Sequence, residues 1–209
     1  MKKYLLVFVI LALVATGVFA QVSLSAGGGL IFDWSFNNGL KLGGNKEAVR
    51  MLSIGGFGFF DATYVEADVY FAYGKNTWYY KGGGSSGTDD GGSMIQLGFS
   101  LLGKYPFELG SITLFPLLGI NYNVVLNAWD PDGNSVTPGG ESAVKWLSQF
   151  GILGGVGLDF DITDSLYLRG EALLHLRLPM KLMSDMAGGS VKATLGVGPV
   201  IKVALGYKF

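Results

Sequence analysis

Residues 191–209 alternate between apolar side chains and small or charged ones, and this period of two limits the fold more than any other feature. The terminal Phe209 belongs to the apolar set, whereas Lys202 belongs to the other set. Successive side chains of a β-strand point to opposite faces, so the pattern predicts a long strand with one apolar face. The chain therefore ends on an aromatic residue of that face.

Seven earlier segments divide in the same way, so we expect an all-β chain with eight antiparallel strands. The expected strands lie near residues 22–36 and 51–60 and over residues 63–73, 94–105, 112–126, 150–160, 166–178 and 191–209. The two faces of the second strand contrast poorly, so its register is not fixed. Pro116 and Pro199 each remove a ladder donor inside an expected strand, which predicts a bulge or a distorted register at both.

Short and long connections alternate between these strands. Short turns are expected at residues 61–63, 106–110 and 161–164, and longer polar connections at residues 37–50, 81–93, 128–145 and 179–189. Short turns at one end and long loops at the other are typical of a transmembrane β-barrel with periplasmic turns and extracellular loops. The sequence therefore predicts an eight-stranded antiparallel transmembrane β-barrel.

Residues 1–20 have the pattern of a secretory signal peptide. Lys2 and Lys3 precede an apolar run over residues 4–14, and small residues at Val18 and Ala20 suit cleavage after Ala20. The run is shorter than the ~20 apolar residues that a membrane-spanning helix needs. We therefore expect residues 21–209 to form one exported barrel domain.

The exported chain is slightly acidic and poor in charge. Without Lys2 and Lys3, 13 of the 15 basic residues remain against 16 acidic ones, a net charge of −3 that argues against nucleic acid as a partner. The chain has no cysteine, and so neither a disulfide framework nor an acceptor for a lipoprotein anchor. Charged residues make up only 15% of the sequence, against ~25% in typical soluble domains.

Ionisable residues in mid-strand fall on the polar faces and decide which face meets lipid. We predict a lumenal charge network that consists of Glu66, Asp68, Arg169, Glu171, His175, Arg177, Lys192 and Lys202. Such side chains are very costly in hydrocarbon but not in a paired lumen. An eight-stranded barrel is just wide enough for side chains to fill, so a nearly balanced set predicts no wide aqueous channel. The alternative is a soluble barrel with its apolar faces turned inward.

Aromatic residues gather near both ends of the expected strands. All four tryptophans lie near the long connections, and Trp78 and Trp129 have the polar parity. Two aromatic bands about one hydrocarbon thickness apart are expected of a barrel anchored at both membrane interfaces. We assign the following residues to this girdle: Trp34, Trp146, Tyr105 and Phe160.

Two segments resemble the small outer-membrane β-barrel proteins of the OmpX/OmpW type. They are the terminal LGYKF of residues 205–209 and the strand-turn-strand GVGLDFDITDSLYLRGEALL of residues 155–174. The resemblance implies a barrel surrounded by outer-membrane lipid in a diderm bacterium. It also implies that Tyr207 and Phe209 form the terminal signal that the barrel-assembly machinery recognises.

The resemblance leaves the function open between two branches. The OmpW branch implies a narrow path for small or apolar solutes. The OmpX branch implies a filled, non-enzymatic barrel whose projecting loops serve envelope structure or surface interaction, which is the function we favour. We expect a monomer, and the sequence identifies no extracellular partner.

Three further motifs contain residue types that are common in functional sites. His175 could centre a barrel hydrolase, but residues 173 and 177 of its face supply no serine nucleophile, so we expect no catalytic residue. The segment DPDGNSVTPGGE of residues 130–141 has Ser135 where a calcium loop needs glycine, so we expect no metal site. The glycine triplets at residues 27–29 and 82–84 lack the context of a phosphate-binding loop, and we expect no cofactor.

Overall fold

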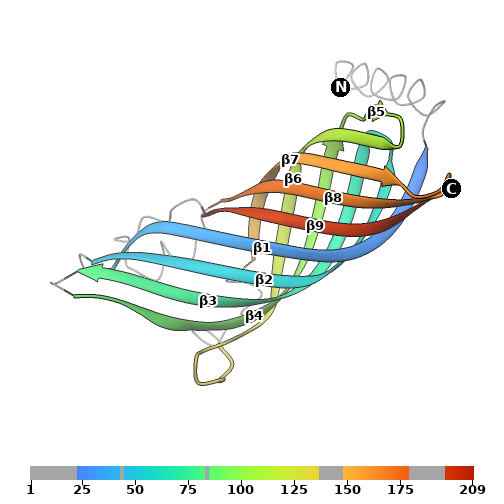
Figure 1. Ribbon diagram of the computed structural model, residues 1–209. Helices are drawn as coiled ribbons and strands as arrows, with labels where there is room; N and C mark the ends of the chain where they lie inside the picture. The colour runs from blue at the N-terminus through green and yellow to red at the C-terminus, as the bar shows by residue number, and fades with distance from the viewer. Residues whose placement is uncertain (1–22, 43–44, 83–84, 137–147, 179–195) are drawn as a thin grey trace, which may run out of the picture.

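The computed structural model describes residues 23–42, 45–82, 85–136, 148–178 and 196–209 (Figure 1). The expected signal peptide, Trp146 and Lys192 lie outside these ranges. The described residues include no helix that is long and apolar enough to cross a membrane. The described chain is built from strands and the turns between them.

The strands pair with their sequence neighbours in antiparallel fashion. They are β1 (Leu24–Leu42), β2 (Asn45–Ala62), β3 (Val65–Gly82), β4 (Ser85–Lys104), β5 (Phe107–Leu109), β6 (Ile112–Trp129), β7 (Gln149–Asp161), β8 (Leu166–Arg177) and β9 (Gly196–Lys208). β1 pairs with β9, and β4 pairs with β6 past the short β5. The eight long strands therefore close into a barrel, which confirms the predicted fold class.

The barrel has two distinct ends. The turn end holds the short connections at residues 63–64, 110–111 and 162–165 together with Phe209. The opposite end is the loop end, where β1–β4 extend beyond β7–β9 (Figure 1).

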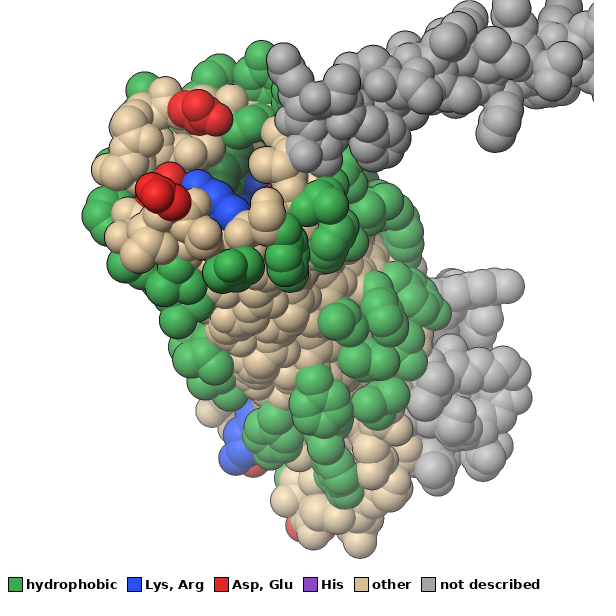
Figure 2. All heavy atoms as spheres, turned by 90° about the vertical axis from the view of Figure 1, so that its right-hand side faces the viewer, with side chains coloured by type: hydrophobic (Ala, Val, Ile, Leu, Met, Phe, Trp, Pro, Cys, Tyr) green, Lys and Arg blue, Asp and Glu red, His purple; other side chains and the backbone are tan. Residues whose placement is uncertain are grey.

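The predicted alternation of faces is confirmed along the described strands. On β8, Arg169 and His175 are buried inside the barrel, whereas Leu168 and Leu174 are exposed outside. The register of β2, which the sequence leaves open, places Phe57 inside. Figure 2 shows apolar side chains over the outer surface, around an end where acidic and basic side chains lie within the ring.

Two of the predicted long connections are wrong. Residues 37–42 and 45–50 continue the β1–β2 ladder, and residues 85–93 continue β4 against β3. Gly, Ser and Asp have weak strand propensity, but a propensity is easily overridden where a long hairpin supplies a paired neighbour. β5 occupies part of the predicted turn at residues 106–110. The connection predicted at residues 179–189 lies outside the described residues.

The bulges predicted at Pro116 and Pro199 are also wrong, because both residues lie where a ladder is interrupted without a change of register. The β5 pairing of β6 ends at Leu114 and the β4 pairing begins at Leu117, so Pro116 falls in the gap. The β1–β9 pairing likewise skips Pro199 and keeps its register on both sides. A missing donor costs little where the ladder has no bond to lose.

Candidate functional site

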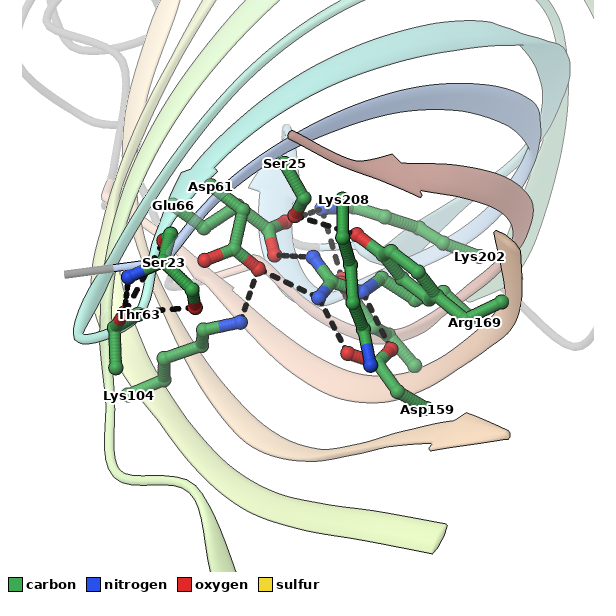
Figure 3. A network of polar contacts seen from close by, with 12 residues as sticks. Ser23, Ser25, Asp61, Thr63, Glu66, Lys104, Asp159, Arg169, Lys202 and Lys208 are labelled. Carbon is green, nitrogen blue, oxygen red and sulfur yellow. Dashed lines mark hydrogen bonds and ion pairs between the residues drawn. The ribbon is translucent and has the colours of Figure 1, made fainter. Parts of the chain in front are cut away.

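Arg169 of β8 lies inside the barrel near the turn end and is 1% exposed. Its Nε and Nη2 donate to the two carboxylate oxygens of Asp159, each at 2.7 Å, and its Nη1 donates to Glu66 Oε2 at 2.5 Å. Nη2 also donates to Asp61 Oδ2 at 2.6 Å, and Lys104 Nζ donates to the same oxygen (Figure 3). One guanidinium thus connects β8 to β2, β3 and β7.

Aromatic rings enclose this guanidinium. Its central carbon lies 4.5 Å from the ring centroid of Phe59, 5.1 Å from that of Phe115 and 5.2 Å from that of Tyr167. The Tyr167 hydroxyl in turn forms a 2.7 Å hydrogen bond with Ser25 Oγ. The rings exclude water and contribute cation–π attraction, so the ion pairs act in a low dielectric.

Lys202 of β9 forms the next layer toward the loop end. Its Nζ donates to Asp68 Oδ2 at 2.5 Å and lies 3.1 Å from Glu171 Oε2 and 3.9 Å from Glu66 Oε1. The ammonium is also 5.3 Å from the ring centroid of Phe57. Glu66 therefore lies between the two cations and joins their clusters.

Arg177, His175 and Asp33 form a third layer. Arg177 Nη2 donates to Asp33 Oδ2, and His175 Nδ1 lies 3.9 Å from the same oxygen. Among the described residues, the buried His175 Nε2 has no hydrogen-bond partner. A hydrolase centre needs a nucleophile within hydrogen-bond reach of its base.

The interior network is larger than the residues singled out from the sequence. The structure brings together the predicted acidic and basic members that it describes, which are Glu66, Asp68, Glu171, Arg169, Arg177 and Lys202. It adds four members: Asp33, Asp61, Lys104 and Asp159. Asp159 and Lys104 lie on predicted polar faces, so their parity could have assigned them. Asp61 falls in a segment predicted as a turn, and Asp33 lies in a glycine-rich strand whose faces were not assigned.

A pocket of about 260 Å³ lies inside the barrel toward the loop end. Its lining is mostly apolar and includes Val49, Met51, Trp78, Met94, Val125 and Trp129. Trp78 and Trp129 thus point inward, as their polar parity indicates, and are not part of an outer girdle. Two hydrogen bonds lie below the pocket, Gln96 Nε2 to Ser53 Oγ at 2.8 Å and Tyr70 hydroxyl to Asn123 Oδ1.

Aromatic residues mark the two ends of the outer surface. Trp34 is 39% exposed toward the loop end, and Tyr105 and Phe160 are exposed at the turn end. Tyr207 and Phe209 pack edge to face at the turn end, with ring centroids 5.7 Å apart. Both rings remain more than half exposed and are accessible from outside the barrel.

The segment that partly resembles a calcium loop, residues 130–141, begins with a tight turn after β6. The Asn134 side chain donates to Asp130 Oδ2 at 3.1 Å and its N–H donates to Oδ1 at 2.8 Å, which holds the pKa of Asp130 below its usual range. Glu141 lies outside the described residues. Among those described, no group of three or more acidic or histidine side chains could hold a metal ion.

Comparison with known proteins gives a likeness of fold. No family model and no curated protein sequence matches the chain. The crystal structure of Neisserial surface protein A superposes with a TM-score of 0.52 at 12% identity, over 89% of this chain and 97% of that one. The Escherichia coli outer membrane protein W gives a TM-score of 0.44 at 14% identity, over 87% of this chain and 98% of that one. Ail from Yersinia pestis, solved in complex with a heparin analogue, gives a TM-score of 0.42 at 16% identity, over 90% of this chain and 99% of that one.

The substitution Arg169→Met tests the interior network. It removes an ion-pair partner from three buried carboxylates, Asp61, Glu66 and Asp159, so we expect it to lower the free energy of unfolding by about 3–5 kcal/mol. The matched control is Lys208→Met, which removes the partly exposed 2.6 Å pair with Asp161 and should cost at most about 1 kcal/mol. Urea unfolding in lipid vesicles measures both. Equal losses for the two variants would contradict a stabilising role for the Arg169 cluster.

Proposed function

We propose that this chain, which has the fold of the small outer-membrane β-barrel proteins, resides in the outer membrane of a diderm bacterium as a barrel with a closed, charge-filled lumen. Its turn end would face the periplasm and its loop end the exterior. It serves envelope structure or surface interaction through the loop end and carries out no catalysis. We expect it to act as a monomer.

The observation that carries this proposal is the distribution of side chains between the two sides of the barrel wall. Large apolar residues such as Phe71, Leu118 and Leu205 are about half or more exposed on the outside, while ionisable residues are buried inside. A soluble barrel would place these apolar faces inward, away from water. Apolar-out and polar-in alternation over a closed barrel is the arrangement that a lipid environment requires.

The paired interior supports a closed lumen. The layers around Arg169, Lys202 and Arg177 follow one another along the barrel axis, and each joins strands from different parts of the wall. Ion passage would require separating buried charges, which costs several kcal/mol for each partner left alone. In this proposal the barrel therefore does not act as an open aqueous pore.

The surroundings of His175 in the described part of the chain form no organised catalytic group, which supports a non-enzymatic role. His175 is buried in mid-barrel, and its nearest acidic partner, Asp33, is shared with Arg177. A Cβ at Gly151 would collide with the Nε2 atom of His175, so the backbone of β7 approaches the imidazole closely. A substrate therefore has no space at the imidazole edge that would take a proton.

We also propose that Tyr207 and Phe209 act as the terminal signal for the barrel-assembly machinery. Their rings are exposed on the outer surface at the turn end. That position is the one from which a periplasmic receptor would reach the last strand before the barrel closes. The β1–β9 pairing would then form as the final seam.

Single-cysteine labelling tests location and orientation together, because the native chain has no cysteine. Asp132→Cys lies in the turn after β6 at the loop end, and Asp164→Cys lies in the turn between β7 and β8. In intact cells, we expect a membrane-impermeant maleimide to label Asp132→Cys. It should label Asp164→Cys only after the outer membrane is permeabilised. Recovery of the protein in the soluble periplasm, or the opposite labelling pattern, would refute the proposal.

The loop-end pocket favours a second candidate function, a narrow site for the capture or passage of small apolar solutes. Its volume of about 260 Å³ is near the lower end of small-molecule sites, and its lining combines tryptophan and methionine with a few polar groups. The hydrogen bonds and ion pairs beneath it leave no open route toward the turn end. A solute that entered would therefore need to leave by another way.

Filling the pocket tests this second candidate. Ala128 is buried in the pocket lining, so Ala128→Trp should weaken binding of N-phenyl-1-naphthylamine by at least about tenfold. The matched control is Ala172→Trp, which places the same side chain on the outward face of β8 and should leave binding unchanged. Dye fluorescence on the purified barrel measures both. Equal binding by the two variants, or none by the wild type, would eliminate this function.

A further inference from the structure

Two cations lie on the outer surface at the edge of the apolar belt. From the turn end upward, the outward positions of β2 and β3 carry no charge as far as Leu52 and Tyr73. The next outward residues on these strands are Arg50 and Lys75, and both are exposed. Leu52 pairs with Lys75 across the ladder. The charges therefore begin where the lipid-facing surface of these strands ends.

A groove of about 350 Å³ lies on the outside of the wall between these side chains. Its lining includes Trp34, Phe36, Arg50, Leu52, Lys75 and Thr77. Met51 lines both the groove and the pocket inside the barrel, while the other groove residues point outward and give it apolar surface on its turn-end side. The groove thus combines hydrocarbon contact with positive charge.

The side chain of Arg50 is held in place by two aromatic rings. Its guanidinium carbon lies 4.3 Å from the ring centroid of Tyr79 and 5.7 Å from that of Phe36. Such contacts leave the N–H donors at the guanidinium edge available. Among the described residues, neither Arg50 nor Lys75 forms an ion pair with a carboxylate.

The neighbouring strand supplies one outward carboxylate, Asp90, which does not neutralise the groove. Asp90 pairs with Thr77, and Thr77 pairs with Arg50 on the other side, so β3 separates Asp90 from Arg50, whereas Lys75 and Asp90 lie on adjacent strands and leave one cation in excess. Asp90 Oδ1 instead accepts the N–H of Gly92 at 2.9 Å. The groove therefore keeps a net positive charge.

We propose that this groove binds the phosphate group of a phosphorylated lipid in the outer leaflet, with an acyl chain lying over Leu52 and Ile54. This inference rests on the proposed function, because it needs the loop end at the outer surface of the membrane. A guanidinium with free edge donors forms bidentate, charge-assisted hydrogen bonds with phosphate, and a nearby ammonium adds a second contact.

A lipid fits the groove better than a free phosphate ion does. Two exposed cations alone attract a soluble anion weakly, because water and salt screen them. A lipid also covers the apolar surface formed by Leu52, Ile54 and Trp34. In addition, the bilayer already holds its headgroup at the level where the cations lie.

Native mass spectrometry of the detergent-purified barrel tests the proposal, with lipid A and its fully dephosphorylated analogue as probes. We expect wild type to retain one lipid A and to prefer it over the analogue by roughly tenfold or more. The double variant Arg50→Ser/Lys75→Ser should lose this preference. Arg50→Lys should keep part of it, because the charge remains while the planar fork is lost. The matched control, Lys208→Ser at the turn end, should behave as wild type.

Three results would overturn the proposal: equal preference in the double variant, no preference for lipid A in wild type, or complete displacement of lipid A by millimolar inorganic phosphate. The mobility of unheated protein on gels checks that each variant is folded, and Lys75→Ser alone serves as the test variant if the double variant is not. Binding in detergent does not depend on orientation in the cell. Failure here therefore leaves the cysteine-labelling result of the proposed function intact.

Discussion

A chain that crosses hydrocarbon must pair every backbone N–H and C=O within itself, and the rest of this structure depends on that constraint. The β1–β9 and β4–β6 ladders close the sheet on both sides, so the long strands present no unpaired edge to lipid. Closure then divides each strand into a lipid face and a lumen face. The alternation of apolar and polar residues in the sequence follows from that division.

The lumen face creates a second requirement, because charges that avoid lipid are brought together in a narrow bore. These charges must be paired, and Arg169 forms ion pairs with three carboxylates at once. Lys202 pairs with Asp68 in the next layer toward the loop end. These interior ion pairs link strands from different parts of the barrel wall. The two binding sites that we propose therefore lie elsewhere, in the loop-end pocket and on the outer surface around Arg50.

The sequence predicts well which side of the barrel wall a side chain faces, but poorly which distant residues it contacts. Alternation assigns Glu66 and Arg169 to the lumen, but their contact joins positions 103 residues apart and depends on the register of every strand between them. The role of Asp61 was hidden because a turn-like sequence continues β2, and the hairpins beyond residue 37 were hidden because pairing overrides weak propensity. Pro116 shows the same limit, since its tolerance depends on a gap in the ladder that only the assembled sheet reveals.

Spin-label accessibility along β9 in lipid vesicles tests the central claim, the apolar-out and polar-in barrel, most directly. Labels at Val203→Cys and Leu205→Cys should collide readily with oxygen dissolved in lipid and little with a water-soluble nickel chelate. Labels at Val200→Cys and Ala204→Cys, whose native side chains are buried inside, should be shielded from both reagents. The reversed parity, or nickel access to the outward positions equal to their oxygen access, would contradict the account.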